Sequence, residues 1–162
     1  KSIQTTPAHQ LALAAVYYSP LQYMYWYDKP SDSQDEPELK FFDDVYTTWD
    51  DTKVLQGEVG EFITIARRKG EEWFIGSITN NEKRVLSVSL DFLPEGKNYI
   101  AEIYTDGDKS VKTRTKVRVS TYRVSNKTKL NFCLKASGGG AVRLVPDDGN
   151  IKSVKNYKQQ RL

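Results

Sequence analysis

Two residue types that carry much of protein chemistry are almost missing from this chain of 162 residues. Its one cysteine, Cys133, forms no internal disulfide, and its one histidine, His9, builds no histidine-rich metal site. No apolar run is long enough to span a bilayer, and the amino end lacks the basic and then apolar pattern of a secretion signal. Because the chain starts at Lys1 and not at Met, we expect it to be a piece of a longer protein.

A strong charge of one sign is also missing. The formal net charge is +3, so the composition gives no general case for a nucleic-acid-binding protein. Mean hydropathy is −0.61, yet 12% of the residues are aromatic, which indicates a packed core and not a disordered chain. The length fits one domain, or one domain with an attachment.

The first segment, residues 1–30, predicts a helix that needs neighbours. Thr6 followed by Pro7 is a good helix start, because the hydroxyl caps free N–H groups and the proline needs no N–H bond. Residues 11–16 (LALAAV) are apolar on every side, and Pro20 ends or kinks the helix before a run of aromatics. We therefore expect residues 11–27 either to be disordered or to form a homodimer, and we favour the homodimer.

An acidic connector follows, predicted over residues 31–53. Between residues 28 and 51 there are nine Asp or Glu against two lysines, a net charge of 2 − 9 = −7. Its prolines and serines indicate a loop with one short helix around residues 38–42. The composition is that of a calcium site, but the ordered D-x-[DN]-x-[DN]-G spacing of a calcium loop is missing. A solvated linker is the favoured interpretation.

Residues 54–146 have the period-two pattern of an antiparallel β-sandwich with six to eight short strands. The clearest element is a hairpin, FITIAR and EWFIGSIT, with its turn at residues 69–71. Basic residues alternate with threonine or valine over residues 112–119, which predicts a half-buried strand. Residues 147–162 are polar and are predicted to be a terminal extension.

Carboxylates beside a tryptophan are typical of a sugar-cleaving site, and Glu71 and Glu72 precede Trp73. Adjacent strand residues point to opposite faces, so these two side chains do not flank one glycosidic bond as a catalytic pair must. We interpret them as a solvated turn and predict that Trp73 lies in the core.

Asp50 and Asp51 follow Trp49 in the same way. No histidine is near them, and no glycine-rich phosphate loop exists. They too are predicted to be part of a solvated linker. The residues therefore offer no catalytic, substrate-binding or metal-binding side chain.

Four further features have a structural and a functional interpretation. Residues 109–129 hold eight basic residues and no acidic one. We interpret them as the solvent-exposed side of an edge strand, in preference to an anion-binding face. We predict that Cys133 is a buried small hydrophobe and that His9 is satisfied by a backbone carbonyl. The tripeptide 126–128 (NKT) fits a glycosylation acceptor, but so short a pattern occurs by chance.

Three long stretches carry a resemblance to a known family: HQLALAAVYYSPLQYM, TTWDDTKVLQGEVGEFITIARRKGEEWFIGSITN and LSVSLDFLPEGKNYIAEIYTDG. In this order, over about residues 5–146, they resemble the carboxy-terminal part of a glycoside hydrolase family 97 enzyme, an α-glucosidase or α-galactosidase of the Bacteroides type. In that family a catalytic (β/α)8 barrel is followed by a smaller β-sandwich. The resemblance implies that residues 1–30 end the barrel and that residues 54–146 form the trailing sandwich, which packs against the barrel and stabilises it.

The resemblance also implies what this piece lacks. The family's catalytic carboxylates and its calcium ion belong upstream of Lys1, so the piece is expected to hold no cofactor and to be no enzyme by itself. The parent is expected to be an α-glycosidase that acts on α-linked oligosaccharides in the periplasm or cell envelope. Two alternatives stay open: a carbohydrate-binding module, with Trp49, Trp73 or the tyrosines near Tyr23 as its platform, and a structural or adhesive sandwich.

Overall fold

A computed structural model describes residues 4–23, 26, 30–32, 36–151 and 153–159. Two α-helices, two 3₁₀-helices and eight strands follow one another along these residues. The helical elements are α1 (Pro7–Val16), η1 (Pro30–Asp32), η2 (Pro37–Leu39) and α2 (Lys40–Asp44). The strands are β1 (Asp51–Glu58), β2 (Phe62–Lys69), β3 (Glu72–Thr79), β4 (Arg84–Ser89), β5 (Asn98–Asp106), β6 (Val117–Ser125), β7 (Lys129–Leu134) and β8 (Gly139–Pro146).

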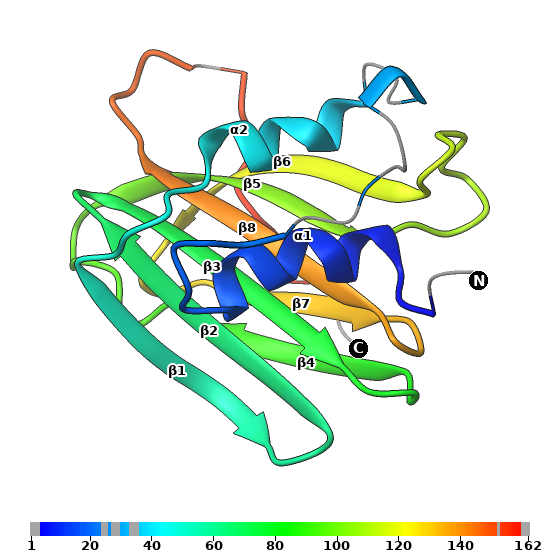
Figure 1. The fold of residues 1–162 in the computed structure, drawn as a ribbon. Helices are drawn as coiled ribbons and strands as arrows, with labels where there is room; N and C mark the ends of the chain where they lie inside the picture. Colours follow the sequence, from blue (N-terminus) through cyan, green and yellow to red (C-terminus); the bar gives the residue numbers. More distant parts are fainter. Residues whose placement is uncertain (1–3, 24–25, 27–29, 33–35, 152, 160–162) are drawn as a thin grey trace.

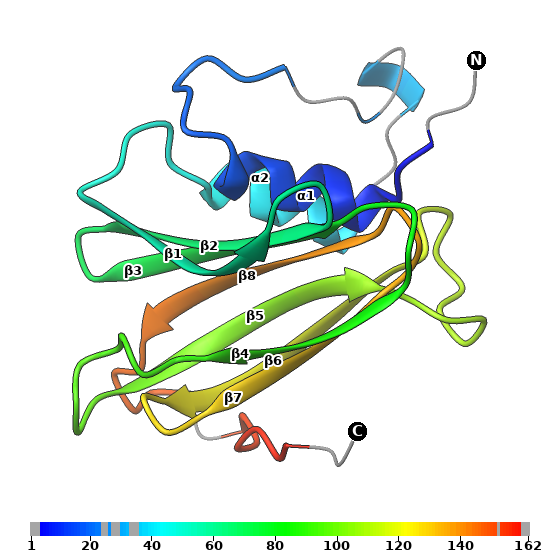
Figure 2. The ribbon, with the colours of Figure 1, turned by 90° about the horizontal axis from the view of Figure 1, so that it is seen from below.

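The strands form two antiparallel sheets (Figures 1 and 2). The large sheet has the order β1-β2-β3-β8-β5-β6, and the small sheet is the pair β4-β7. Figure 2 shows the small sheet on one face of the large sheet, here called the inner face, and the helices on the other, the outer face. The predicted antiparallel β-sandwich with a preceding helix is confirmed.

The main core lies between the two sheets. Trp73 is only 4% exposed there, its ring centroid 4.7 Å from that of Phe92, so the prediction of a core indole is confirmed. The strands bring apolar side chains to this core at every second position, as the period-two pattern predicted. Its largest other members are Ile75, Leu90, Tyr99, Leu130, Phe132 and Leu144.

Helix α1 packs on the outer face of the chain's own large sheet. Thr6 Oγ1 accepts a hydrogen bond from the His9 N–H (3.2 Å), and Pro7 starts the helix, as predicted. The helix approaches β3 and β8 closely because both strands carry a glycine beneath it. A Cβ on Gly76 would collide with the Ala12 carbonyl oxygen and lie 2.9 Å from Val16 Cγ2, and one on Gly139 would lie 2.5 Å from His9 Cα.

This packing corrects the expectation that residues 11–16 need neighbours from outside the chain. Leu11, Ala12 and Ala15 are fully buried against the sheet. The expectation was wrong because a helix rich in alanine can lie almost directly on a glycine-bearing strand, which the spacing of apolar residues did not reveal.

The carboxyl end of α1 is held by side chains far away in the sequence. The Arg67 guanidinium, with the residue only 2% exposed, donates to the carbonyl oxygens of Ala15 (2.5 Å) and Val16 (2.8 Å). Gln22 folds back and donates to the Ala14 and Tyr17 carbonyl oxygens. A cation beside free carbonyls complements the negative end of a helix, so Arg67 stabilises the end of α1, where the backbone turns extended at Tyr17.

Two predictions within the β-rich part are wrong. The strand expected over residues 112–119 starts only at Val117, because Lys116 adopts a left-handed conformation (φ 58°) that a strand does not continue through. Cys133 is exposed and not buried. Its neighbours Phe132 and Leu134 point into the core, so β7 does alternate, with the opposite phase to the one expected.

Strand β6 lies at an edge of the large sheet, so the edge-strand interpretation of the basic stretch is right for Arg118 and Arg123 and wrong for its other six basic residues, which lie outside β6. The polar tail covers part of this edge. The Arg123 N–H donates to Lys155 O, the Tyr157 N–H donates to Arg123 O (both 2.9 Å), and the Tyr157 hydroxyl accepts from the Asn131 N–H (3.0 Å). At the other end, β1 takes in residues 51–53 of the expected connector. The division into domains at residues 30, 53 and 146 stays a prediction.

Candidate functional site

The carboxylates at the β2–β3 turn do not converge on one point. Glu71 is exposed and pairs with Lys97 (3.0 Å), while Glu72 pairs with Arg143 Nε (2.9 Å). The two carboxylates therefore have different partners on different strands and loops. The solvated interpretation is right for Glu71 and wrong for Glu72, because the cation that binds Glu72 lies on β8, 71 residues away.

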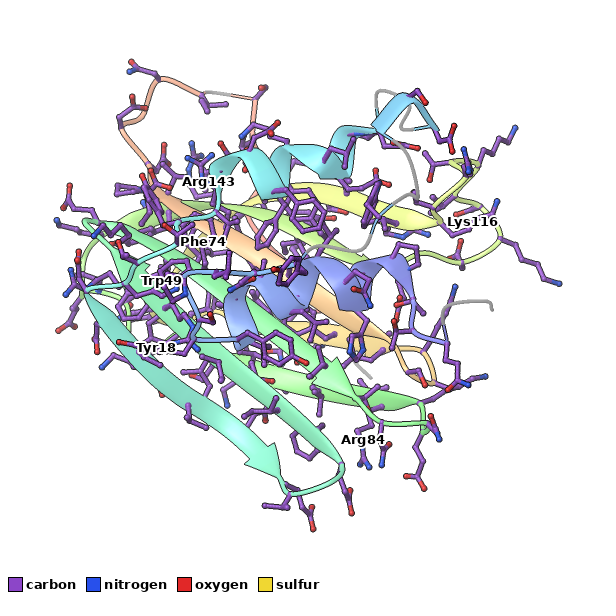
Figure 3. The ribbon with its side chains drawn as sticks, in the orientation of Figure 1. Tyr18, Trp49, Phe74, Arg84, Lys116 and Arg143 are labelled. Carbon is purple, nitrogen blue, oxygen red and sulfur yellow. The ribbon has the colours of Figure 1, made fainter. Side chains whose placement is uncertain are left out.

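Arg143 is the centre of an ionic cluster beneath α2 (Figure 3). Its Nη1 lies 2.9 Å from an Asp44 oxygen and 3.6 Å from a Glu102 oxygen, and Lys40 contacts both carboxylates. Burial, with the nearby Glu102 and Asp44 carboxylates, raises the pKa of the neighbouring Tyr104 phenol. The three carboxylates share these two cations, so the cluster fastens α2 to β3, β5 and β8.

Asp50 closes the β2–β3 turn and is not a solvated linker residue. Its carboxylate accepts from the Gly70 N–H (2.8 Å) and from Lys69 Nζ (3.2 Å). The hydrogen bond from Gly70, with the Lys69 ammonium, holds the pKa of Asp50 below its ordinary value of 3.8. Asp51 begins β1 and lies 3.4 Å from Lys53. Neither aspartate faces a partner carboxylate across a cleft.

We predict that Asp50→Asn removes part of the acid sensitivity of folding. Because the folded-state pKa is depressed, ionised Asp50 stabilises the fold above its ordinary pKa of 3.8, and that contribution disappears as the pH falls through the lower folded value. Asparagine keeps an acceptor for the Gly70 N–H and removes only the charge. Urea unfolding midpoints of both proteins should therefore differ at pH 7 and converge below about pH 4. A gap of constant size from pH 7 to pH 3 would contradict this.

The tryptophans do not form a sugar platform. Trp73 is in the core, and Trp49 is half-buried against Phe74, with ring centroids 5.5 Å apart (Figure 3). The exposed aromatic side chains instead follow α1, in residues 17–23, here called the aromatic segment. Tyr18 is 72% and Tyr23 94% exposed, and Leu21 between them is 71% exposed. Residues 24, 25 and 27 of the predicted aromatic run lie outside the described residues.

His9 serves the fold, as predicted. Its Nδ1 lies 3.0 Å from the Gly138 carbonyl oxygen, and burial lowers the pKa of the imidazole. Within the described part of the chain, no three His, Cys, Asp or Glu side chains gather in a way that would hold a metal ion. The helices found there are too short or too polar to cross a membrane.

A second apolar surface lies at the end of the β1–β2 hairpin, over residues 57–63, here called the hairpin tip. Val59 at its turn is fully exposed (102%), and Val54 on β1 is 66% exposed. Beside them is a hollow of about 580 Å³ that Phe62, Ile63 and Ile78 also line. Sequence reasoning missed this surface, although an apolar Val59 between two glutamates in a turn was its signal.

Known proteins resemble this chain over most of its length. The family model described as "Glycosyl-hydrolase 97 C-terminal, oligomerisation" matches residues 48–145. A retaining alpha-galactosidase of Bacteroides thetaiotaomicron is 34% identical over 142 residues, which are 87% of this chain and 21% of that protein.

Solved structures agree with this match. A glycoside hydrolase family 97 enzyme from Pseudoalteromonas sp. strain K8, in complex with acarbose, superposes with a TM-score of 0.79 at 37% identity, over 88% of this chain and 23% of that one. A beta-arabinopyranosidase shares the fold, with a TM-score of 0.70 at 23% identity, over 88% of this chain and 22% of that one. The chain thus spans about a fifth to a quarter of these relatives, and it belongs to the family of carboxy-terminal oligomerisation domains of glycosyl hydrolase 97, as the sequence resemblance indicated.

Proposed function

We propose that this domain is a non-catalytic contact module of a longer family 97 α-glycosidase, which hydrolyses α-glucosidic or α-galactosidic bonds. The observation that carries the proposal is that the carboxylates beside its tryptophans are bound to other groups of the domain. Glu72 and Asp50 are committed to Arg143 and to the Gly70 turn, and Glu71 to Lys97 on the surface. A glycosidase needs two carboxyl groups facing one bond across a cleft, and none of these groups has such a partner.

The first contact is with the catalytic barrel of the same polypeptide. One side of α1 lies on the sheet and its other side is half-buried, while the aromatic segment that follows is largely exposed. Leu13, Ala14 and Tyr17 line a hollow of about 430 Å³ there, next to the exposed Tyr23. Most of the length of the relatives lies outside the region that this chain matches. Apolar area of this extent on a soluble domain is normally covered by a partner, and the barrel fits this side because the resemblance assigns residues 1–30 to its end.

The second contact is with another copy, which the description of the family names as oligomerisation. The homodimer expected through residues 11–27 needs revision, because residues 11–16 are mostly covered by the chain's own sheet. Among the described residues of that stretch, the exposed side chains belong to the aromatic segment, and we assign this segment to the barrel.

Three accessory expectations differ in their support. The resemblance implies calcium and an envelope location for the parent, but the described residues offer no donor set for the ion. A carbohydrate-binding module would use Trp49, Trp73 or the tyrosines near Tyr23 as a flat platform. Both tryptophan rings pack against other aromatic side chains, and we assign the exposed tyrosines to the contact with the barrel. The contact module is therefore the better interpretation of this domain.

The proposal is tested on the purified chain by two measurements. We predict that sedimentation velocity from micromolar to millimolar concentration finds a reversible dimer or higher oligomer. We also predict no release of nitrophenol from the α-glucoside or the α-galactoside. A chain that stays monomeric throughout would overturn the self-association, and hydrolysis by contaminant-free protein would overturn the non-catalytic assignment.

A further inference from the structure

We propose that two copies of this domain associate through the hairpin tip, with Val59 of each copy entering the hollow beside Val59 of the other. This inference rests on the proposed self-association and names the surface that performs it. Figure 1 shows that the β1–β2 hairpin reaches beyond the helical layer, where a second copy has access to it.

The residue at the turn is the first argument. The Glu61 N–H donates to Glu58 O (3.0 Å), which makes residues 58–61 a tight turn, and Gly60 supplies the positive φ (78°) that it needs. Turns of this kind favour Asn, Asp, Ser, Pro and Gly, and a solvated turn gains nothing from a β-branched apolar side chain. Val59 nevertheless stands at its apex, fully exposed. Its burial becomes favourable only when a partner covers it.

The rigidity of the tip is the second argument. Asn80 donates from its side chain to Gly60 O (3.1 Å) and from its backbone to Glu61 O (2.8 Å). Arg84 pairs with Glu61 (2.6 Å) and lies over the Phe62 ring (5.2 Å), as Figure 3 places it beside the hairpin. A surface that is already ordered loses less conformational entropy on association than a mobile loop does. The β3–β4 connection therefore holds Val59 in place for a contact.

The pairing of a projection with a hollow is the third argument. A two-fold interface is self-complementary, so each copy has to offer both the inserted group and its receptor. The hairpin tip offers Val59 as the projection and, directly beside it, a mainly apolar hollow of about 580 Å³. Val54, Ile63 and Ile78 form the walls that would receive the partner's side chain.

Charge favours the same occupant. Glu58, next to Val59, and Lys83, in the connection that braces the tip, are both exposed and have no ion-pair partner among the residues that the structure describes. A two-fold axis through the tip lets Glu58 of one copy approach Lys83 of the other, and the reverse. Glu61, the other acid of the tip, is already neutralised by Arg84.

The two free edges of the large sheet are poorer candidates for a second copy. At β6, the tail occupies the backbone of Arg123 on the open side. At β1, the pairing with β2 shifts between Val54 and Gln56, and Lys53 stands in the middle of the strand. Irregular pairing and a lysine within the strand both oppose strand addition at this edge, so we place the contact on side chains of the hairpin tip.

The experiment compares the oligomeric state of the full chain with that of matched variants. Val59→Asp places a charge on the projection and is expected to weaken dimerisation by about 100-fold or more, because each interface contains the change twice. Val85→Asp is the control, since Val85 is also an exposed valine (54%) but lies on β4 of the small sheet. Tyr23→Ser removes an exposed ring of the aromatic segment. Both of these variants are expected to dimerise as the unchanged chain does.

Thermal unfolding of Val59→Asp should match that of the unchanged chain at low concentration, because the side chain makes no contact that folding needs. If the unchanged chain is dimeric and Val59→Asp remains equally dimeric, the hairpin tip is not the interface and this inference is wrong, while the proposed function stands. If Tyr23→Ser alone gives monomers, the aromatic segment is the interface. If the unchanged chain is monomeric at every concentration, the proposed self-association itself fails.

Discussion

Replacing Trp73 by alanine is expected to lower the free energy of unfolding by about 3–5 kcal/mol. The indole is 4% exposed and packs against Phe92 between the two sheets, with Lys53 Nζ 6.0 Å from its ring centroid. Its removal leaves a cavity among strands whose positions are set by their hydrogen-bonded neighbours, so the walls collapse only in part. Urea unfolding followed by far-ultraviolet circular dichroism measures the loss without relying on tryptophan fluorescence.

Two variants make this result specific. Trp49→Ala removes the same side chain from a half-buried position on the outer face, where less apolar area is buried, and should cost clearly less. Trp73→Phe keeps an aromatic ring in the core. Its loss in free energy of unfolding should lie between those of Trp49→Ala and Trp73→Ala. An unchanged urea midpoint for Trp73→Ala would mean that the indole is not part of the core. It would then support the interpretation of Trp73 as a sugar platform.

Replacing Gly76 by valine is expected to detach α1 from the sheet and to cost about 3 kcal/mol or more. A Cβ at this position meets the Ala12 carbonyl oxygen and, at 2.9 Å, Val16 Cγ2. The first of these is backbone of the helix, so no change of rotamer relieves the collision. Leu11, a fully buried side chain of α1 itself, would leave its packing position when the helix moves.

Hydrogen exchange separates local detachment from global unfolding. Amides of residues 7–16 should lose protection in Gly76→Val, while the sandwich amides of β5 and β8 keep theirs. Gly57→Val is the control. Gly57 lies in the edge strand β1, far from the helix, and a Cβ there would lie 3.2 Å from Phe62 O. Protection of residues 7–16 that equals that of the unchanged chain would show that the helix does not depend on this glycine.

Local chemistry determined much of the secondary structure. Thr6 and Pro7 start α1 because capping needs only a hydroxyl and a proline at neighbouring positions. The hairpin of β2 and β3 follows from two alternating runs around Gly70, whose positive φ (57°) closes the turn. Such signals lie within a few residues of one another, so the sequence by itself is sufficient to predict them. The family resemblance was likewise readable, because its stretches are long.

The tertiary structure decided which face each residue joined and what it met there. Period two indicates that Phe132 and Cys133 point in opposite directions, but not which of them points into the core, since that depends on where the other sheet lies. Glu72 pairs with Arg143 across 71 residues of sequence, and Arg67 donates to the end of α1 across 52 residues. No local pattern encodes either contact. In the sequence, Gly76 indicates only a weakened strand. The structure shows that its missing side chain makes room for α1. Local propensities act over one or two turns of chain, whereas these contacts exist only once the sheet has brought distant strands and α1 together.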